Sequence, residues 1–104
     1  MKTRKIKFSV YAIRWFDKIN GNTYHSTKII RTKDSKVIIS NAMVYGYEDC
    51  YKQTALDVML NAAWLPKAYK NNLYMYEREN NYPIAWRVVD GLKLDMINNV
   101  ILKK

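Results

Sequence analysis

The stretch that decides the fold is residues 46–66, GYEDCYKQTALDVMLNAAWLP, which has the clearest helical period in the chain. Its apolar residues recur at spacings of three and four, which places them on one side of a helix. The residues expected on this core-facing side are Tyr51, Ala55, Val58, Met59 and Ala62. Glu48 and Asp49 fall in the first turn, where carboxylates favour the positive end of the helix dipole. Pro66 is expected to end the helix, because it has no N–H to donate.

Upstream of this helix, the sequence has the period of a β-strand. Over residues 5–16, apolar side chains alternate with polar or solvent-facing ones, which is typical of a strand with one buried face. The residues expected on the buried face are Ile6, Phe8, Val10 and Ala12. Asn20 and Gly21 then predict a two-residue hairpin turn, because both positions of such a turn need positive φ. With further strands over residues 23–32 and 37–40, the pattern predicts an antiparallel meander of three strands.

The two-residue turn also predicts which residues face each other across the hairpin. The expected pairs are Tyr11 with Ile30, Ile13 with Lys28, and Trp15 with Ser26. Since side chains alternate along a strand, Lys28 then lies on the outer face of the meander. The first strand contributes Lys5, Lys7 and Tyr11 to the same face.

Downstream of the helix, the pattern is less regular. Residues 67–72 are polar and predict a loop, whereas residues 73–78 (LYMYER) fit either a strand or a helical turn. Residues 82–89 have the alternation of a strand, and we favour a second hairpin formed by these two segments. Asp90 is expected to cap a closing helix by accepting hydrogen bonds from its first turn. The apolar stripe of that helix comprises Leu92, Met96, Ile97, Val100 and Ile101.

These elements predict one α+β domain over residues 1–104, a length that suits a single domain. The expected order is β-β-β-α-(β)-β-α. The sheet is antiparallel, a three-stranded meander with one or two further strands, and two helices pack on one of its faces.

The composition excludes several classes of protein. Cys50 is the only cysteine, so an internal disulfide is impossible and a reducing compartment is expected. No apolar run reaches the roughly 18–20 residues needed to cross a bilayer, and the N-terminus lacks the pattern of a cleavable signal peptide. We therefore predict a cytoplasmic protein with no membrane partner.

No residue pattern points to catalysis, a metal or a cofactor. His25 is the only histidine, and a zinc site would need further Cys or His ligands, of which the chain has only Cys50. Its three glycines cannot build a phosphate-binding loop. We predict that the chain is not an enzyme, has no catalytic or metal-binding residue, and needs no cofactor.

The positive charge is concentrated near the start of the chain. The net charge is +9, and residues 1–36 hold ten Lys or Arg against two Asp, a net of +8. A basic third beside a nearly neutral remainder indicates a surface for an anionic partner. Basic groups neutralise phosphates, and exposed aromatic rings offer planes on which bases stack. The predicted nucleic-acid contacts are Lys5, Lys7, Tyr11, Lys28, Arg31, Lys33 and Lys36.

A second hypothesis is that the chain binds a protein, and a third is that its lysines only solvate the sheet. Apolar residues on the outer side could form an interface or a homodimer seam. The candidates are Ile13, Trp15, Ile30, Leu60 and Trp64. Under this hypothesis the chain is an inhibitor of a host defence or replication protein, or a homo-oligomeric structural component of a virion.

Two segments carry a resemblance to a known group of proteins. Residues 15–26 (WFDKINGNTYHS) and 45–55 (YGYEDCYKQTA) resemble small tailed-phage proteins with no assigned activity. The resemblance implies a phage accessory protein that works in the bacterial host cytoplasm. We expect it to bind DNA, RNA or a nucleic-acid-handling complex through a basic sheet face.

The layout of three strands followed by a helix that opens after Gly46 also resembles the later part of a double-stranded-RNA-binding domain. In that family, a cluster of lysines at the start of the last helix contacts phosphates. Here the matching turn holds Glu48, Asp49 and Lys52, and the family's leading helix has no counterpart. This resemblance therefore implies a similar layout and not the same binding residues.

Overall fold

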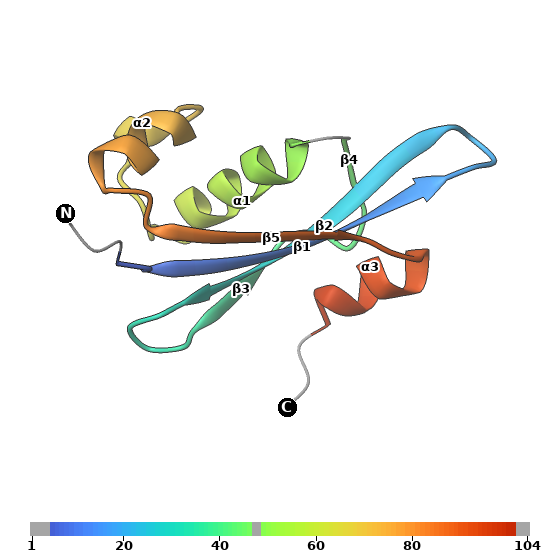
Figure 1. The fold of residues 1–104 in the computed structure, drawn as a ribbon, viewed down its shortest axis with the longest axis horizontal. Helices are drawn as coiled ribbons and strands as arrows, with labels where there is room; N and C mark the ends of the chain where they lie inside the picture. The colour runs from blue at the N-terminus through green and yellow to red at the C-terminus, as the bar shows by residue number, and fades with distance from the viewer. Residues whose placement is uncertain (1–4, 47–48, 102–104) are drawn as a thin grey trace.

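The structure is a computed structural model that describes residues 5–46 and 49–101 (Figure 1). It confirms an α+β fold with a mostly antiparallel sheet. Its strands are β1 (Phe8–Asp17), β2 (Asn22–Arg31), β3 (Val37–Ile39), β4 (Val44–Tyr45) and β5 (Ile84–Asp90). Its α-helices are α1 (Cys50–Asn61), α2 (Leu73–Glu79) and α3 (Lys93–Asn99), and η1 (Lys67–Tyr69) is a single 3-10 turn. Within the described ranges, no helix is long and apolar enough to span a membrane.

The strands are arranged in the order β3-β2-β1-β5, with the short β4 also paired to β2. β1 and β2 are antiparallel, but β5 runs parallel to β1, from Phe8 opposite Ile84 to Arg14 opposite Asp90. The predicted second hairpin is therefore wrong. Parallel strands need a long crossover, which here includes α1 and α2.

The ambiguous segment at residues 73–78 belongs to helix α2. The side chain of Asn72 accepts a hydrogen bond from the backbone N–H of Met75 at 3.2 Å and caps the helix. Tyr76 is buried and meets Tyr69 edge-on at 5.1 Å between ring centroids. Local capping and burial of one helical face therefore decide the conformation, which the short apolar pattern alone left open.

The β1–β2 hairpin closes through a four-residue loop, Lys18 to Gly21, and not through the predicted two-residue turn. The Asp17 carboxylate accepts hydrogen bonds from the backbone N–H groups of Ile19 and Asn20, at 3.0 and 3.3 Å. Gly21 is the loop residue with positive φ. The register is thus shifted by two residues: Tyr11 faces Lys28, Ile13 faces Ser26, and Trp15 faces Tyr24. A shift of two leaves every side chain on its predicted face.

The main core lies between α1 and one face of the sheet. It contains Phe8, Val10, Ile29, Ala55, Leu56, Met59, Leu65, Tyr76 and Ile84. Tyr51, Ala55 and Met59 are buried as predicted, whereas Val58 and Ala62 are half-buried. Leu56, absent from the predicted core stripe, is completely buried.

Helix α1 ends at Asn61, before Pro66. Ala63 has a positive φ of 58°. The N–H of Trp64 donates to the carbonyl of Met59 at 2.9 Å, and the N–H of Ala63 donates to the carbonyl of Leu60 at 3.0 Å. This pair of bonds is a Schellman motif, which satisfies the last carbonyls of a helix. At the other end, Asp49 is the N-cap residue without a side-chain capping bond, and Glu48 lies outside the described residues.

Helix α3 packs on the face of the sheet opposite α1, which corrects the prediction that the two expected helices share one face (Figure 1). The Ser26 hydroxyl donates to the Met96 carbonyl at 2.6 Å, and Met96 is buried. Asp90 does not cap this helix, because it still belongs to β5 and forms an ion pair with Arg14 at 2.9 Å. The carboxylate of Asp95 instead accepts from the Leu92 N–H at 3.0 Å.

Candidate nucleic-acid interface

Helix α3 covers only part of its face of the sheet. Figure 1 shows it below the end of the sheet near the β1–β2 loop, with no described helix below the other end. The strand register places eight side chains on that uncovered part, since residues i and i+2 of a strand share a face. We call it the open sheet face, and it comprises Ser9, Tyr11, Lys28, Ile30, Val37, Ile39, Ala85 and Arg87.

One row of this face alternates charge and aromatic surface. Arg87, Tyr11 and Lys28 lie side by side on β5, β1 and β2, where neighbouring strands are about 4.8 Å apart. The Lys28 Nζ atom lies 5.7 Å from the centroid of the Tyr11 ring. Tyr11 is 37% exposed. The row therefore presents an accessible ring between two cations, and the open sheet face contains no carboxylate.

A small hollow adjoins this row at the boundary with α3. It has a volume of about 100 Å³, and its lining residues are Tyr11, Ala12, Ile13, Arg87, Val89 and Asn99. The Asn99 amide nitrogen donates to the Tyr11 carbonyl at 3.0 Å and to the Ser26 carbonyl at 3.3 Å. These bonds fix the last turn of α3 against β1 and β2, so the hollow is bounded by groups held in place.

The structure brings together three of the seven predicted nucleic-acid contacts. Tyr11 and Lys28 lie in the central row, and the exposed Lys7 lies beyond Ser9 at the edge of the open sheet face, on the same side by the alternation of the strand. The Lys7 backbone is held there, because its carbonyl accepts from the Thr32 N–H at 2.9 Å. Lys5 is exposed just before β1.

The other three predicted contacts lie at the β2–β3 turn. Arg31 faces Phe8 across the hairpin and so points to the α1 side of the sheet. Its guanidinium lies 4.5 Å from the Trp64 ring centroid and donates to Asp34 at 2.7 Å. Arg31 holds the pKa of the Asp34 carboxyl down to about 2. Lys33 and Lys36 are exposed in the same turn.

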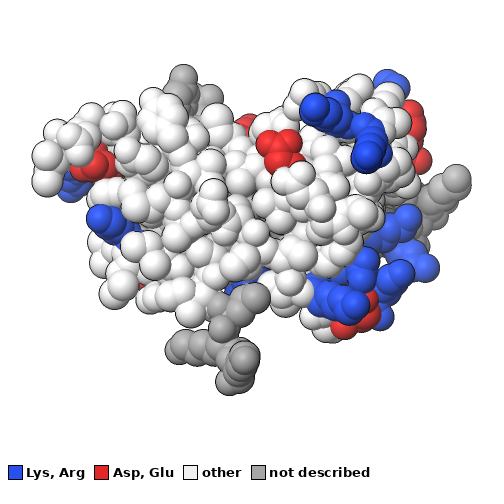
Figure 2. Space-filling view, turned by 180° about the vertical axis from the view of Figure 1, so that it is seen from behind, with Lys and Arg blue, Asp and Glu red and all other residues white. Residues whose placement is uncertain are grey.

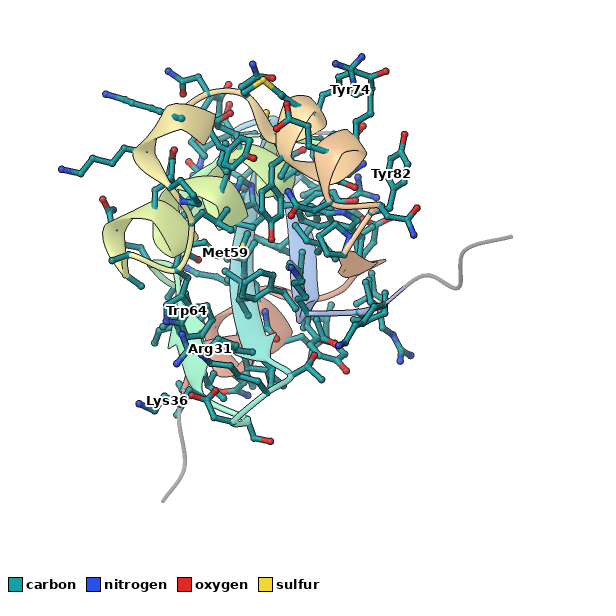
Figure 3. All side chains as sticks on the ribbon, turned by 90° about the vertical axis from the view of Figure 1, so that its left-hand side faces the viewer. Arg31, Lys36, Met59, Trp64, Tyr74 and Tyr82 are labelled. Carbon is teal, nitrogen blue, oxygen red and sulfur yellow. The ribbon has the colours of Figure 1, made fainter. Side chains whose placement is uncertain are left out.

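The figures show this separate basic end of the molecule. In Figure 3, Arg31, Lys36 and Trp64 lie together at the lower left. Figure 2 shows Lys and Arg side chains gathered at the lower right, with acidic side chains among them. Part of that charge is balanced by the Arg31–Asp34 pair. The basic end and the open sheet face are thus two surfaces, and the seven predicted residues do not form one site.

The predicted protein-contact residues are also divided between the two sides of the sheet. Leu60 and Trp64 pack against the main core, and the Trp64 ring stacks on Phe8 at 5.8 Å. Trp15 stacks on Tyr24 at 5.9 Å, and the Lys93 Nζ atom lies 5.5 Å from its ring centroid. Ile13 lies at the start of the region under α3, so close to Gly91 that a Cβ added there would lie 3.2 Å from its Cγ2 atom. Ile30 belongs to the open sheet face.

Sequence reasoning missed Arg87 and Asn99. The alternation of residues 82–89 could have placed Arg87 on the side opposite Ile84 and Trp86. It could not show that this strand lies beside β1, because the partner of a strand is set by the whole fold. Asn99 is the last residue of α3, and its role depends on how that helix docks.

His25 is buried and links β2 to the start of α1. Its Nδ1 lies 3.2 Å from the Gly46 carbonyl and its Nε2 lies 2.6 Å from the Thr54 hydroxyl. Burial lowers the pKa of His25, so the neutral ring is favoured, with Nδ1–H donating to Gly46 and Nε2 accepting from Thr54. Among the residues that the structure describes, no cluster of three or more His, Cys, Asp or Glu could hold a metal ion.

Comparison with known proteins identifies no relative. No family model matches the chain, and neither does any curated protein or solved structure. The resemblance to tailed-phage proteins and the layout likeness to the double-stranded-RNA-binding domain therefore stay predictions.

Proposed function

We propose that the chain binds nucleic acid through the open sheet face. The observation that carries the proposal is the row of Arg87, Tyr11 and Lys28, which sets an exposed ring between two cations. Cationic side chains neutralise phosphates, and an aromatic plane stacks with a base whatever its identity. A role as a phage accessory protein in a bacterial host is part of the same proposal and rests on the sequence resemblance alone.

The wider charge distribution supports this choice of surface. The exposed Lys7 is a third cation at the edge of the open sheet face, beyond Ser9, and a net charge of +9 attracts polyanions from a distance. Lys33 and Lys36 lie outside the open sheet face and would contribute to this long-range attraction. Three phosphate contacts predict that log Kd varies with log salt concentration with a slope of magnitude about 2 for a single strand.

The proposal is tested by reversing charge on the open sheet face. We expect the double variant Lys28→Glu/Arg87→Glu to weaken binding of a fluorescein-labelled 20-mer by about a hundredfold in 50 mM salt, measured by fluorescence anisotropy. The matched control is Lys70→Glu/Arg78→Glu, which changes the net charge equally at exposed positions around α2. Equal losses in both variants, or no binding of DNA or RNA by micromolar wild-type protein, would overturn the proposal.

A protein partner is the second candidate function, and a different surface favours it. A groove of about 900 Å³ lies where the β1–β2 loop meets the β5–α3 connection. Large apolar side chains are exposed there, with Phe16 at 54% and Ile19 at 94% exposure. Exposed apolar patches of this kind are common at protein–protein contacts.

This alternative makes its own prediction. If the groove is a seam between two copies or the site of a host protein, Phe16→Ser/Ile19→Ser should abolish the association and leave oligonucleotide binding unchanged. Analytical ultracentrifugation over a hundredfold range of concentration, together with a pull-down from host lysate, measures the association. A concentration-independent monomer that captures no host protein would reject the alternative.

A further inference from the structure

We propose that the ligand of the open sheet face is a single-stranded nucleic acid, one unpaired base of which stacks on Tyr11 beside the hollow near Asn99. This inference rests on the nucleic-acid binding proposed above and names its substrate class. Four observations support it: the accessibility of the ring, the small side chains beside it, the hollow at its edge, and the position of its two cations.

The accessible ring of Tyr11 is the first observation. In a duplex, the faces of the bases are already stacked on their neighbours, and only base edges are presented in the grooves. An aromatic plane on a protein surface can therefore stack only with a base that has left the stack or was never in one. A tyrosine that is 37% exposed and lies between cations suits a single strand better than a duplex.

The second observation is the space beside the ring. On the side away from α3, the neighbours of Tyr11 on its own strand and on β5 are Ser9 and Ala85. Both side chains are too short to reach over the plane of a tyrosine on the same face, so β1 and β5 do not block a base stacked on Tyr11 from this direction. On β2, the neighbours are the half-buried Ile30 and Lys28, whose Nζ atom lies over the ring and would move aside to contact a phosphate.

The third observation is the hollow of about 100 Å³ on the other side of the ring. Ile13 and Val89 give it apolar surface, while Arg87 and Asn99 bring polar groups to it. Apolar walls with a few fixed polar groups are the usual composition of a small-ligand site. The Asn99 amide nitrogen is within hydrogen-bond distance of three acceptors, the carbonyls of Tyr11 and Ser26 and the Ser26 hydroxyl, so its amide is held in one orientation.

The fourth observation is the placement of the cations. Lys28 and Arg87 come from the strands on either side of β1, so their Cα atoms are separated by about 10 Å across the sheet. A base on Tyr11 would lie between them, and the phosphates on its 5′ and 3′ sides would each be within reach of one long cationic side chain. The row thus matches a strand that crosses the sheet from β5 to β2.

The experiment compares four fluorescein-labelled 12-mers with the full chain at one salt concentration. They are single-stranded DNA, single-stranded RNA, a blunt DNA duplex, and an abasic deoxyribose-phosphate strand with the same number of phosphates. We expect at least one of the single strands to bind about tenfold more tightly than both the duplex and the abasic strand. If the duplex or the abasic strand binds as tightly as the single strands, the inference is overturned while nucleic-acid binding itself survives. If none of the four binds, the proposed function fails as well.

Variants at Tyr11 locate the stacking. Tyr11→Ser should weaken single-strand binding about tenfold and leave the abasic strand unaffected, whereas Tyr11→Phe, which keeps the ring, should bind within about twofold of wild type. The matched control is Tyr74→Ser on α2, because Tyr74 is 67% exposed and has the guanidinium of Arg78 5.5 Å from its ring centroid. A loss in Tyr74→Ser equal to that in Tyr11→Ser would overturn the assignment. Circular dichroism of each variant confirms that it is folded before binding is measured.

Discussion

The two faces of the sheet are covered to very different extents. On the α1 side, Val10, Ile29 and Ile84 are fully buried beneath a helix of 12 residues. On the other side, α3 has only 7 residues and leaves the row around Tyr11 accessible. The first face stabilises the fold by apolar burial, while part of the second remains accessible to solvent. Substitutions on the two faces should therefore change different measured quantities.

The largest expected effect is on the covered face. Leu56→Ala removes a completely buried side chain and should lower the free energy of unfolding by about 3 kcal/mol. Ile39→Ala, at a half-buried position on the open sheet face, should cost roughly 1 kcal/mol, because less surface is buried there. Urea denaturation measures both. Similar losses would show that the faces do not differ as described.

The second prediction concerns the buried His25 on the covered face and the pH dependence of the free energy of unfolding. Burial lowers the pKa of His25 from its ordinary value of 6.5, so between the two values the unfolded chain takes up a proton that the folded chain does not. The contribution of His25 to the free energy of unfolding should be fully present above pH 6.5 and should decrease as the pH falls toward the lowered pKa. Urea midpoints between pH 7.5 and 5 measure this slope.

The control for this pH dependence is His25→Gln, which cannot titrate. This variant should be less stable at pH 7.5 and should lack most of the slope between pH 7.5 and 5. Asp34 does not interfere, because its pKa is lowered to about 2 and it titrates below this range. An unchanged slope in His25→Gln would refute the assignment.

A smaller effect is expected where α3 is attached to the sheet. Asn99→Ala removes the hydrogen bonds to the Tyr11 and Ser26 carbonyls and should cost about 1 kcal/mol. Amide hydrogen exchange should become faster in α3 and remain slow in α1. Faster exchange in α1 as well would indicate that the two layers unfold together.

The smallest effect should be a gain in stability on the covered side. Ala63 adopts a left-handed conformation in the Schellman motif after α1, which costs an alanine roughly 1 kcal/mol relative to glycine. Ala63→Gly should raise the free energy of unfolding by less than about 1 kcal/mol, because glycine loses more entropy on folding. The urea midpoint should rise slightly. A lowered midpoint would mean that the Ala63 methyl group makes contacts worth more than the relief of strain.

Predictions from sequence succeeded where the signal was local and repeated. The alternation from Phe8 to Ala12 predicted the buried face of β1, whereas Ile6 precedes the strand and is half-buried. The spacing of Tyr51, Ala55 and Met59 predicted the buried face of α1. Both patterns are set by side chains a few residues apart. Tyr11 and Lys28 were placed on the correct face even though the hairpin register was wrong, because a shift of two residues conserves the face.

The errors concern information that is not local. The sequence of β5 shows a strand but cannot show that its neighbour is β1, 76 residues earlier, as in the Arg14–Asp90 bond. For the same reason Arg87 was missing from the predicted site. The loop after Asp17 was misread because the Asp17 side chain competes with the Asn20-Gly21 turn by bonding to the backbone N–H groups that follow it.

The parallel pairing of β5 with β1 has a consequence for the order of folding during synthesis. The hairpin leaves the ribosome early, but one edge of its first strand stays without its partner until the last strand emerges. That interval exposes backbone donors and acceptors in the middle of the future sheet, which is a hazard for aggregation. A nascent chain from which β5 has not yet emerged should therefore need a chaperone, whereas one from which β5 has fully emerged should not.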